Sequence, residues 1–357
     1  PNNPVYIQVS FTGPATTNSA GRAFFASRGV TVGPVGDIAA NAPTLAALNA
    51  LRSQQTFDDK LRGTVDAMAY AASLGVTSHF DMGGFILPNA PGHDGEFQAD
   101  GAASWDPYTA YDPILQLNRE KKLRVRIRPF FLSMDTAADI PVLSARVRNS
   151  FREFGNDWLK PAGLGEFISS WALFGLPNPT NYPQAIRAAA SRGWIYQQHT
   201  LSNAEDTFAI SNWEALNQEI KIAPLHWSLA HVLTLTPDNI NRLKALGAGV
   251  ALHGFRYLAG TATANGPPYR TIVDSGIIAG AGSDSAQISA LNPWLMLYYM
   301  TTGKNSSGVL INPGQTLTRY EAMRLYTREN GWFSKEEDKL GSIAVGSSDA
   351  ASARQNI

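Results

Sequence analysis

Five polar residues in the second half of the sequence each come directly after a short apolar or β-rich run. They are Glu166 after "GLG", His199 after "WIYQQ", His231 after "WSLA", His253 after "GVAL" and Asp284 after "IIAGAGS". Imidazole nitrogens and carboxylate oxygens are ligands for borderline divalent cations, and a carboxylate beside such a cation can accept the proton of a water molecule. These residue types therefore predict metal-assisted hydrolysis, provided that the fold brings them together.

The spacing of these residues fits a repeated unit of one strand and one helix, which needs about 30 residues or more. His199 lies 33 residues after Glu166, His231 lies 32 after His199, and Asp284 lies 53 after His231 with the His253 run between them. A single histidine at a strand end is more often a structural residue held by hydrogen bonds. The joint spacing nevertheless favours His199, His231 and Asp284 as metal ligands, with Asp284 and His231 as the catalytic residues.

The elements expected to position these residues alternate between helix and strand. Apolar positions at helical spacing precede Gly75, Gly193, Gly247 and Gly276, and a short apolar run follows each glycine. Glycine commonly ends a helix, so the pattern predicts βα units in a parallel sheet. Counting from "NPVYIQVSF" gives about seven strands, which favours an α/β fold of the (β/α)8 TIM-barrel type that lacks its first βα unit in this chain. Catalytic side chains of such barrels lie at the C-terminal ends of the strands.

We expect one domain over residues 1–357, because a barrel of this kind can absorb the whole length. Residues 85–112 are rich in glycine, proline and aromatic residues and show no periodicity, as is typical of a loop over the active face. Trp105 in this loop is a candidate substrate contact. His253, Arg256 and Tyr257, in and after the "GVALH" run, are further candidates, although a loop salt bridge explains Arg256 equally well.

The composition excludes several classes of binding partner. Lys and Arg total 29 against 29 Asp and Glu, which gives no basic surface for nucleic acid, and the absence of cysteine excludes disulfides and thiolate metal sites. No apolar run is long enough to span a membrane, so no membrane partner is expected and the cytoplasm is the favoured location. A small-molecule substrate is the expected partner, and a homodimer is a further expectation.

Several longer segments carry a family resemblance. They are "GVTSHFDMGG", "YQQHTLSNAEDT", "SLAHVLTLTPDNINRLKALGAGVALH", "SGIIAGAGSDSAQISALNPWLMLYYMTT" and "QTLTRYEAMRLYTRENGWFSKEEDKLGSIAVGSSDA". Together they resemble the amidohydrolase superfamily, in the family 3 branch that includes N-substituted formamide deformylases. The resemblance implies that His199 and His231 bind metal on the fifth and sixth strands. It also implies that Asp284, in "GSD" of the eighth strand, binds metal and transfers a proton.

The sequence departs from the family pattern at its first strand and at Gly165. The first family strand ends in His-x-His, which does not occur here, so the N-terminal part is expected to be missing or to belong to a second chain. Gly165 aligns with a lysine that bridges two metals after carboxylation, and Glu166 replaces it only if a bulge or a register shift turns it inward. Residues 340–357 are expected to begin the return to the accessory β-sandwich of the family.

The resulting hypothesis is a metal-dependent hydrolase that cleaves a C–N bond in an amide, N-acyl or formamide substrate with one or two divalent ions, zinc being favoured. A barrel enzyme of another kind, such as a hydratase or a decarboxylase, is the first rival. A non-catalytic or incomplete barrel, one fragment of a larger or two-chain enzyme, is the second.

Overall fold

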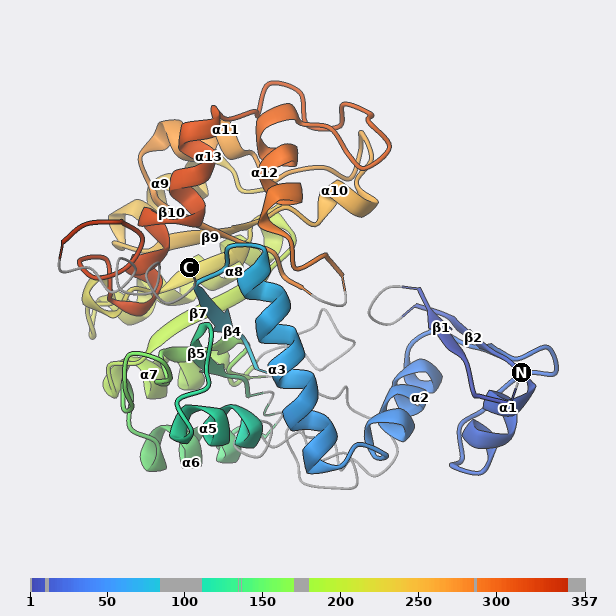
Figure 1. The fold of residues 1–357 in the computed structure, drawn as a ribbon. Helices are drawn as coiled ribbons and strands as arrows, with labels where there is room; N and C mark the ends of the chain where they lie inside the picture. The colour runs from blue at the N-terminus through green and yellow to red at the C-terminus, as the bar shows by residue number, and fades with distance from the viewer. Residues whose placement is uncertain are drawn as a thin grey trace.

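The computed structural model describes residues 2–9, 13–83, 111–133, 135, 137–169, 180–285 and 288–345. Its main feature is a curled parallel sheet of seven strands in the order β10-β9-β8-β7-β6-β5-β4 (Figure 1). The strands are β4 (Ser78–Asp81), β5 (Arg126–Phe131), β6 (Gly163–Glu166), β7 (Ile195–Thr200), β8 (Ser228–His231), β9 (Gly249–His253) and β10 (Ile278–Gly282). The predicted α/β class with a parallel sheet is therefore confirmed, and the curled sheet is a half-barrel.

Helices alternate with these strands, as the periodicity predicts. They are α3 (Phe57–Ser73), α5 (Asp112–Arg119), α6 (Pro141–Asn149), α7 (Tyr182–Ser191), α8 (Asn203–Asn217), α9 (Pro237–Ala245), α10 (Arg256–Ala259), α11 (Tyr269–Ser275), α12 (Pro293–Thr302) and α13 (Arg319–Tyr326), with short 3-10 helices η2 (Ala223–Leu225) and η3 (Arg328–Ser334). Capping boxes at Thr56, Ser202 and Thr318 start α3, α8 and α13. The glycines expected after helices, from Gly75 to Gly276, have positive φ angles of 67–87°.

Side chains on the two faces of the sheet form different cores. The outer face packs against the helices through large buried residues such as Trp194, Trp213 and Trp227. On the inner face Phe130 packs with Ile195. Since successive strand residues alternate between faces, His199 is expected on the same inner face as Ile195, four positions earlier.

A buried ion pair closes the end of the sheet where the strands begin. Arg128 on β5 donates to both carboxylate oxygens of Glu336, at 2.8 and 3.0 Å, and Lys160 Nζ lies 2.9 Å from the same carboxylate. The Arg128 and Glu336 side chains are 1% and 5% exposed. The segment after α13 thus returns to the inner face of the sheet and is fixed there by charge.

Strands β4 and β10 are the two edges of the sheet. The helices that follow these two edges contact each other: Trp294 Nε1 at the start of α12 donates to the carbonyl of Leu74 after α3, at 3.1 Å. Side chains take the place of a neighbouring strand on β10: the Asn330 amide bonds both the N–H and the C=O of Ala281, at 3.0 and 2.9 Å. The described residues therefore supply seven strands to the parallel sheet, and an eight-stranded closed barrel stays a prediction.

The N-terminal region forms its own small sheet to one side of the parallel sheet (Figure 1). Strands β1 (Tyr6–Gln8), β2 (Ala15–Thr17) and β3 (Asp37–Ile38) pair antiparallel and pack with α1 (Ser19–Ala26) and α2 (Ala42–Arg52) around Phe25. The prediction that "NPVYIQVSF" is a strand of the parallel sheet was wrong. Alternation reveals a strand but not its partner, and the short link to β2 permits a hairpin, which is antiparallel.

Other predictions fall partly outside the described residues. Only 111 and 112 of the predicted 85–112 loop are described, and Trp105 is not among them. Residues 340–345 are not in a strand and 346–357 lie outside the described part, so the return to a β-sandwich and the single domain over 1–357 stay predictions. Among the described helices, none combines the length and the apolar character needed to cross a membrane.

Candidate metal centre

Three side chains from neighbouring strand ends form a compact group suited to a metal ion. Glu166 and His231 are the last residues of β6 and β8, and His199 is the next to last residue of β7. One ligand atom from each lies within 4.8 Å of the others. The Glu166 Oε2 atom is 2.9 Å from His199 Nδ1 and 3.4 Å from His231 Nε2. Ligands bound at about 2 Å from one tetrahedral ion lie roughly 3 to 4 Å apart. One carboxylate and two imidazoles therefore fit a divalent cation in both spacing and chemistry.

The position of Glu166 depends on the glycine before it. Gly165 has a φ of 149°, and a Cβ atom there would lie 2.5 Å from the carbonyl oxygen of Gln197 on β7. A side chain at position 165 is therefore excluded, including the lysine expected from the family pattern. The carboxylate of Glu166 takes part in the cluster instead. The sequence analysis expected this only if the local backbone turned Glu166 inward.

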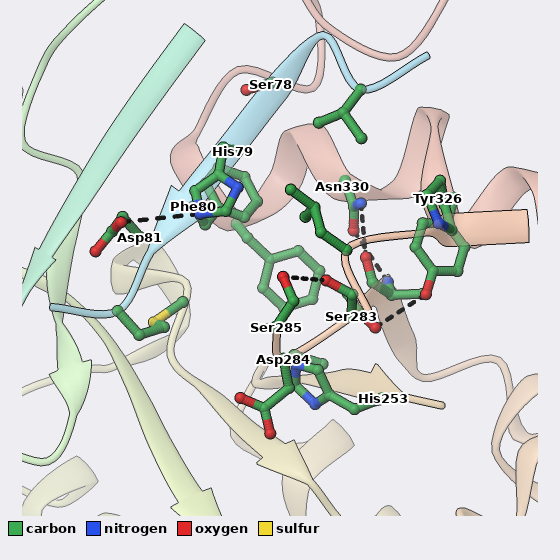
Figure 2. A pocket seen from close by; sticks show the side chains of 18 of the residues that line it. Ser78, His79, Phe80, Asp81, His253, Ser283, Asp284, Ser285, Tyr326 and Asn330 are labelled. Carbon is green, nitrogen blue, oxygen red and sulfur yellow. Dashed lines mark hydrogen bonds and ion pairs between the residues drawn. The ribbon is translucent and has the colours of Figure 1, made fainter. Parts of the chain in front are cut away.

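The predicted ligand Asp284 lies next to this group rather than within it. Its Oδ2 atom is 3.7 Å from His231 Nδ1, on the opposite side of the imidazole from Glu166. Figure 2 shows Asp284 beside His253 in the pocket that the strand ends surround. His231 and Asp284 have φ angles of 71° and 56°, which are uncommon for residues other than glycine and occur often at functional sites. Of the predicted trio, His199 and His231 share the cluster, and Asp284 contacts it through His231.

Burial and charge shift the ionisation of these groups in opposite directions. Burial tends to raise the pKa of Glu166, but the charges and hydrogen bonds of His199 and His231 outweigh it and hold the pKa well below its usual range. Burial and the Glu166 charge raise the pKa of Asp284, against the lowering effect of the histidines. Glu166 is therefore a permanent anion, whereas Asp284 is the carboxyl group better suited to gaining and losing a proton.

The histidines also differ from one another. Burial lowers the pKa of His231, but Asp284 and Glu166 more than compensate and raise it above the usual value. Burial, together with the neighbouring His231 and His199, holds the pKa of His253 well below its usual value. The rings of His199, His231 and His253 follow one another at centroid distances of 4.3 and 4.4 Å. The carboxylates of Glu166 and Asp284 therefore lie on either side of His231, and they favour the protonated form of its imidazole.

The cluster opens into a cavity of about 1320 Å³ between β4 and β10. Lining residues include His253 and Asp284, and on the β4 side His79 and Asp81 (Figure 2). Tyr111 donates to Asp81 Oδ1 at 2.6 Å. Tyr111 belongs to the 85–112 segment that the sequence predicts to be a loop over the active face, whereas the sequence interpretation missed Asp81 as a cavity residue. Asp81 ends a strand and could have been found by the same rule that selected Asp284.

Arg256 and Tyr257, predicted as substrate contacts, are not among the described lining residues of this cavity. The guanidinium of Arg256 lies 5.3 Å from the ring centroid of Phe255, and the Tyr257 ring contacts Tyr298 at 6.0 Å. Their role in substrate binding stays a prediction, as does that of Trp105.

Comparison with known proteins identifies relatives of the fold. A sequence profile described as the amidohydrolase family matches residues 10–348, whereas no curated protein matches the chain. An uncharacterized metal-dependent hydrolase from Pyrococcus horikoshii OT3 is 15% identical with a TM-score of 0.67, over 95% of this chain and 69% of that one. Another from Pyrococcus furiosus is 16% identical with a TM-score of 0.65, over 92% and 67%.

A third solved structure of similar fold is an enzyme crystallised with zinc. The atrazine chlorohydrolase of Arthrobacter aurescens TC1, a mutant crystallised with zinc and atraton, is 14% identical with a TM-score of 0.50, over 79% of this chain and 61% of that one. At these identities the three structures show similarity of fold.

Proposed function

The chain belongs to the amidohydrolase family, and we propose that it is a metal-dependent hydrolase that cleaves a C–N bond of an amide, N-acyl or formamide substrate. The observation that carries this proposal is the group of Glu166, His199 and His231, whose ligand atoms lie within 4.8 Å of one another at the ends of adjacent strands. Side chains at the C-terminal ends of parallel barrel strands are the usual catalytic positions of this architecture.

These three residues would hold a divalent cation, and zinc is favoured because it commonly binds imidazole and carboxylate ligands. Zinc is also present in the crystals of the atrazine chlorohydrolase, whose fold is similar. A bound divalent cation supplies polarisation of the substrate carbonyl and a lower pKa for water. Whether one ion or two bind depends on ligands beyond this group of three.

Asp284 is proposed as the proton carrier. Its carboxylate takes a proton from the attacking water as the new C–O bond forms, and it then gives that proton to the nitrogen as the C–N bond breaks. His231 lies 3.7 Å from Asp284 on one side and orients it, and on the other side it would help to hold the cation. No proton is left over, because the hydroxyl part of the water stays on the carbon and one proton reaches the amine.

The substrate is proposed to be a small amide, with the formamide branch of the family as the closest expectation from the sequence motifs. His253 lines the cavity and is a proposed contact, and Trp105, Arg256 and Tyr257 are proposed contacts from the loops. A cytoplasmic location and a homodimer are part of the same proposal and depend on no feature of the site.

Metal analysis combined with activity assays tests the proposal. Purified protein is expected to contain about one zinc or similar ion per chain and to hydrolyse members of a panel of formamides and N-acyl amino acids. Glu166→Gln and His199→Asn are expected to lose the metal and the activity together. His79→Asn is the matched control, since His79 lines the same cavity outside the ligand group. Wild-type protein without metal, or with metal and a hydratase or decarboxylase activity instead, would contradict the proposal.

A second candidate, an incomplete barrel that works only with a further segment or chain, is favoured by one observation. Both edges of the sheet, β4 and β10, line the cavity of about 1320 Å³, and this is larger than the roughly 300 to 1,000 Å³ of ordinary ligand pockets. Mass spectrometry of the native protein distinguishes the candidates. A longer polypeptide or a stoichiometric second chain favours the incomplete barrel, and an active protein of this mass alone opposes it.

A further inference from the structure

The His253 side chain has no hydrogen bond within the described part of the chain, although it lies beside the candidate metal centre. Its Nδ1 atom is buried and has no partner. The residue lines the cavity, and Figure 2 shows it next to Asp284 there. A buried polar atom without a partner destabilises the folded state. Such groups therefore call for an explanation, and a catalytic role is one of the recognised explanations.

The imidazole of His253 is held in one orientation although no hydrogen bond fixes it. The ring of His231 packs on one side at a centroid distance of 4.4 Å. Gly282 lies on another side, where a Cβ atom would come within 3.2 Å of His253 Nε2. Tyr269 donates to the His253 carbonyl at 3.0 Å and fixes the backbone. A polar group fixed by packing before a ligand arrives loses little entropy on binding.

The two ring nitrogens have different surroundings, and this difference decides where the proton lies. A buried N–H without a partner is rarer and more costly than a buried acceptor without one. The proton of a neutral His253 is therefore expected on Nε2, and Nδ1 carries the lone pair. A protonated imidazole would also carry a proton on Nε2. His253 is thus a donor through Nε2 in either state.

We propose that His253 donates a hydrogen bond from Nε2 to the substrate carbonyl oxygen and stabilises the negative charge that develops on it during hydrolysis. The proposal rests on the hydrolase function above and adds a catalytic residue to it. A neutral imidazole donor suits this role, because it stabilises an oxyanion without bringing a positive charge next to the cation. The favoured substrate is therefore one whose reacting carbon becomes tetrahedral with an oxyanion, as in an amide.

Three substitutions separate this role from a structural one. His253→Ala is expected to lower kcat about 100- to 1,000-fold, as removal of an oxyanion donor does elsewhere, with little change in KM. His253→Gln is expected to restore part of the rate, because its amide N–H can reach the place of Nε2. His253→Asn ends near the level of Nδ1 and is expected to behave like His253→Ala. Metal content and the shape of the pH profile should stay as in the wild type.

An activity of His253→Ala within threefold of the wild type would overturn the proposal while leaving the hydrolase function intact. Equal loss in all three variants, or loss of metal from them, would assign His253 a structural role instead. If the wild type hydrolyses no amide, the proposed function fails. The role of His253 must then be tested by a measurement that does not depend on turnover.

Nuclear magnetic resonance supplies that readout, because the chain has only six histidines. Long-range proton–nitrogen spectra of protein labelled at histidine distinguish the two tautomers, and His253→Gln assigns the signal. The Nε2–H form is expected, and its proton should move downfield when phenylphosphonate, a tetrahedral oxyanion, is added. An Nδ1–H form, or a signal that phenylphosphonate does not change, contradicts the proposal whatever the activity.

Discussion

Asp206 offers a quantitative test of how burial acts in this structure. It lies in the first turn of α8, is 0% exposed, and neither carboxylate oxygen has a hydrogen-bond partner in the described residues. Burial raises its pKa from 3.8 to about 7; the nearby Thr200 hydroxyl, which donates its hydrogen bond to the Ala230 carbonyl and not to the carboxylate, opposes the rise only in part, and Glu205 adds to it. Because the folded state holds this proton and the unfolded state releases it, stability falls as the pH rises from about 4 to about 7. A shift of about three units corresponds to roughly 4 kcal/mol.

Asp206→Asn removes this pH dependence but brings an amide whose N–H groups have no partner, at a cost of about 1 to 3 kcal/mol. The variant should therefore be less stable than the wild type at pH 4.5 and more stable at pH 8. The difference in unfolding free energy between the two proteins should change by roughly 3 kcal/mol across that range, because part of the total shift already falls below pH 4.5. Urea denaturation followed by tryptophan fluorescence, with a chelator present throughout, measures it. Asp274→Asn, at an exposed carboxylate paired with Arg270, is the control. Parallel stability curves for wild type and Asp206→Asn would refute the reasoning.

Three further perturbations follow from the contacts described. Glu336→Gln leaves Arg128 buried without its anion and should cost about 3 to 5 kcal/mol in urea denaturation at pH 7. Since the pKa of Glu336 is about 2 in the fold, where Arg128 and Lys160 outweigh the effect of burial, the loss should shrink as the pH falls from about 4.5 toward 2, and a constant loss would contradict the assignment. Gly165→Ala should lower both stability and metal content, because its Cβ would meet the Gln197 carbonyl; normal metal content in a folded variant would be evidence against the role of Gly165. Treatment with dipicolinate should abolish hydrolysis and added zinc should restore it, and activity that persists in metal-free protein would exclude a metal-dependent reaction.

The site was more predictable from the sequence than the sheet that carries it. Neighbouring parallel strands end at one edge, so polar residues that each follow an apolar run are brought together by topology alone. This rule selected Glu166, His199, His231, His253 and Asp284, and the structure places all five around one cavity. It requires no knowledge of loop conformation, so it applies to a sequence that has long irregular segments.

The details that failed depend on interactions between distant parts of the chain. Alternation along a strand predicts that Gly165 and Glu166 face opposite sides, but it does not reveal that the Gln197 carbonyl occupies the space next to Gly165. Nor does alternation show that Tyr6–Gln8 pairs with β2 instead of a strand of the parallel sheet. The cover of the β10 edge by Asn330 is a contact across 49 residues, and no local pattern encodes it.

The positions of the proposed ligands and of the proposed proton carrier in the sheet suit the roles proposed for them. Glu166, His199 and His231 lie at the C-terminal ends of β6, β7 and β8, which have hydrogen-bonded strands on both sides. Ligand atoms must keep their spacing to within a few tenths of an ångström, and a strand paired on both edges resists displacement. Asp284 instead follows β10, whose outer edge is met by the side chains of Asn330 and Tyr326. A proton carrier must reach the water first and the leaving nitrogen afterwards, so a looser support suits Asp284 where it would harm a ligand. The carboxylate with the lowered pKa thus lies on an inner strand beside two histidines, and the one with the raised pKa follows the edge strand, where burial outweighs the effect of the histidines.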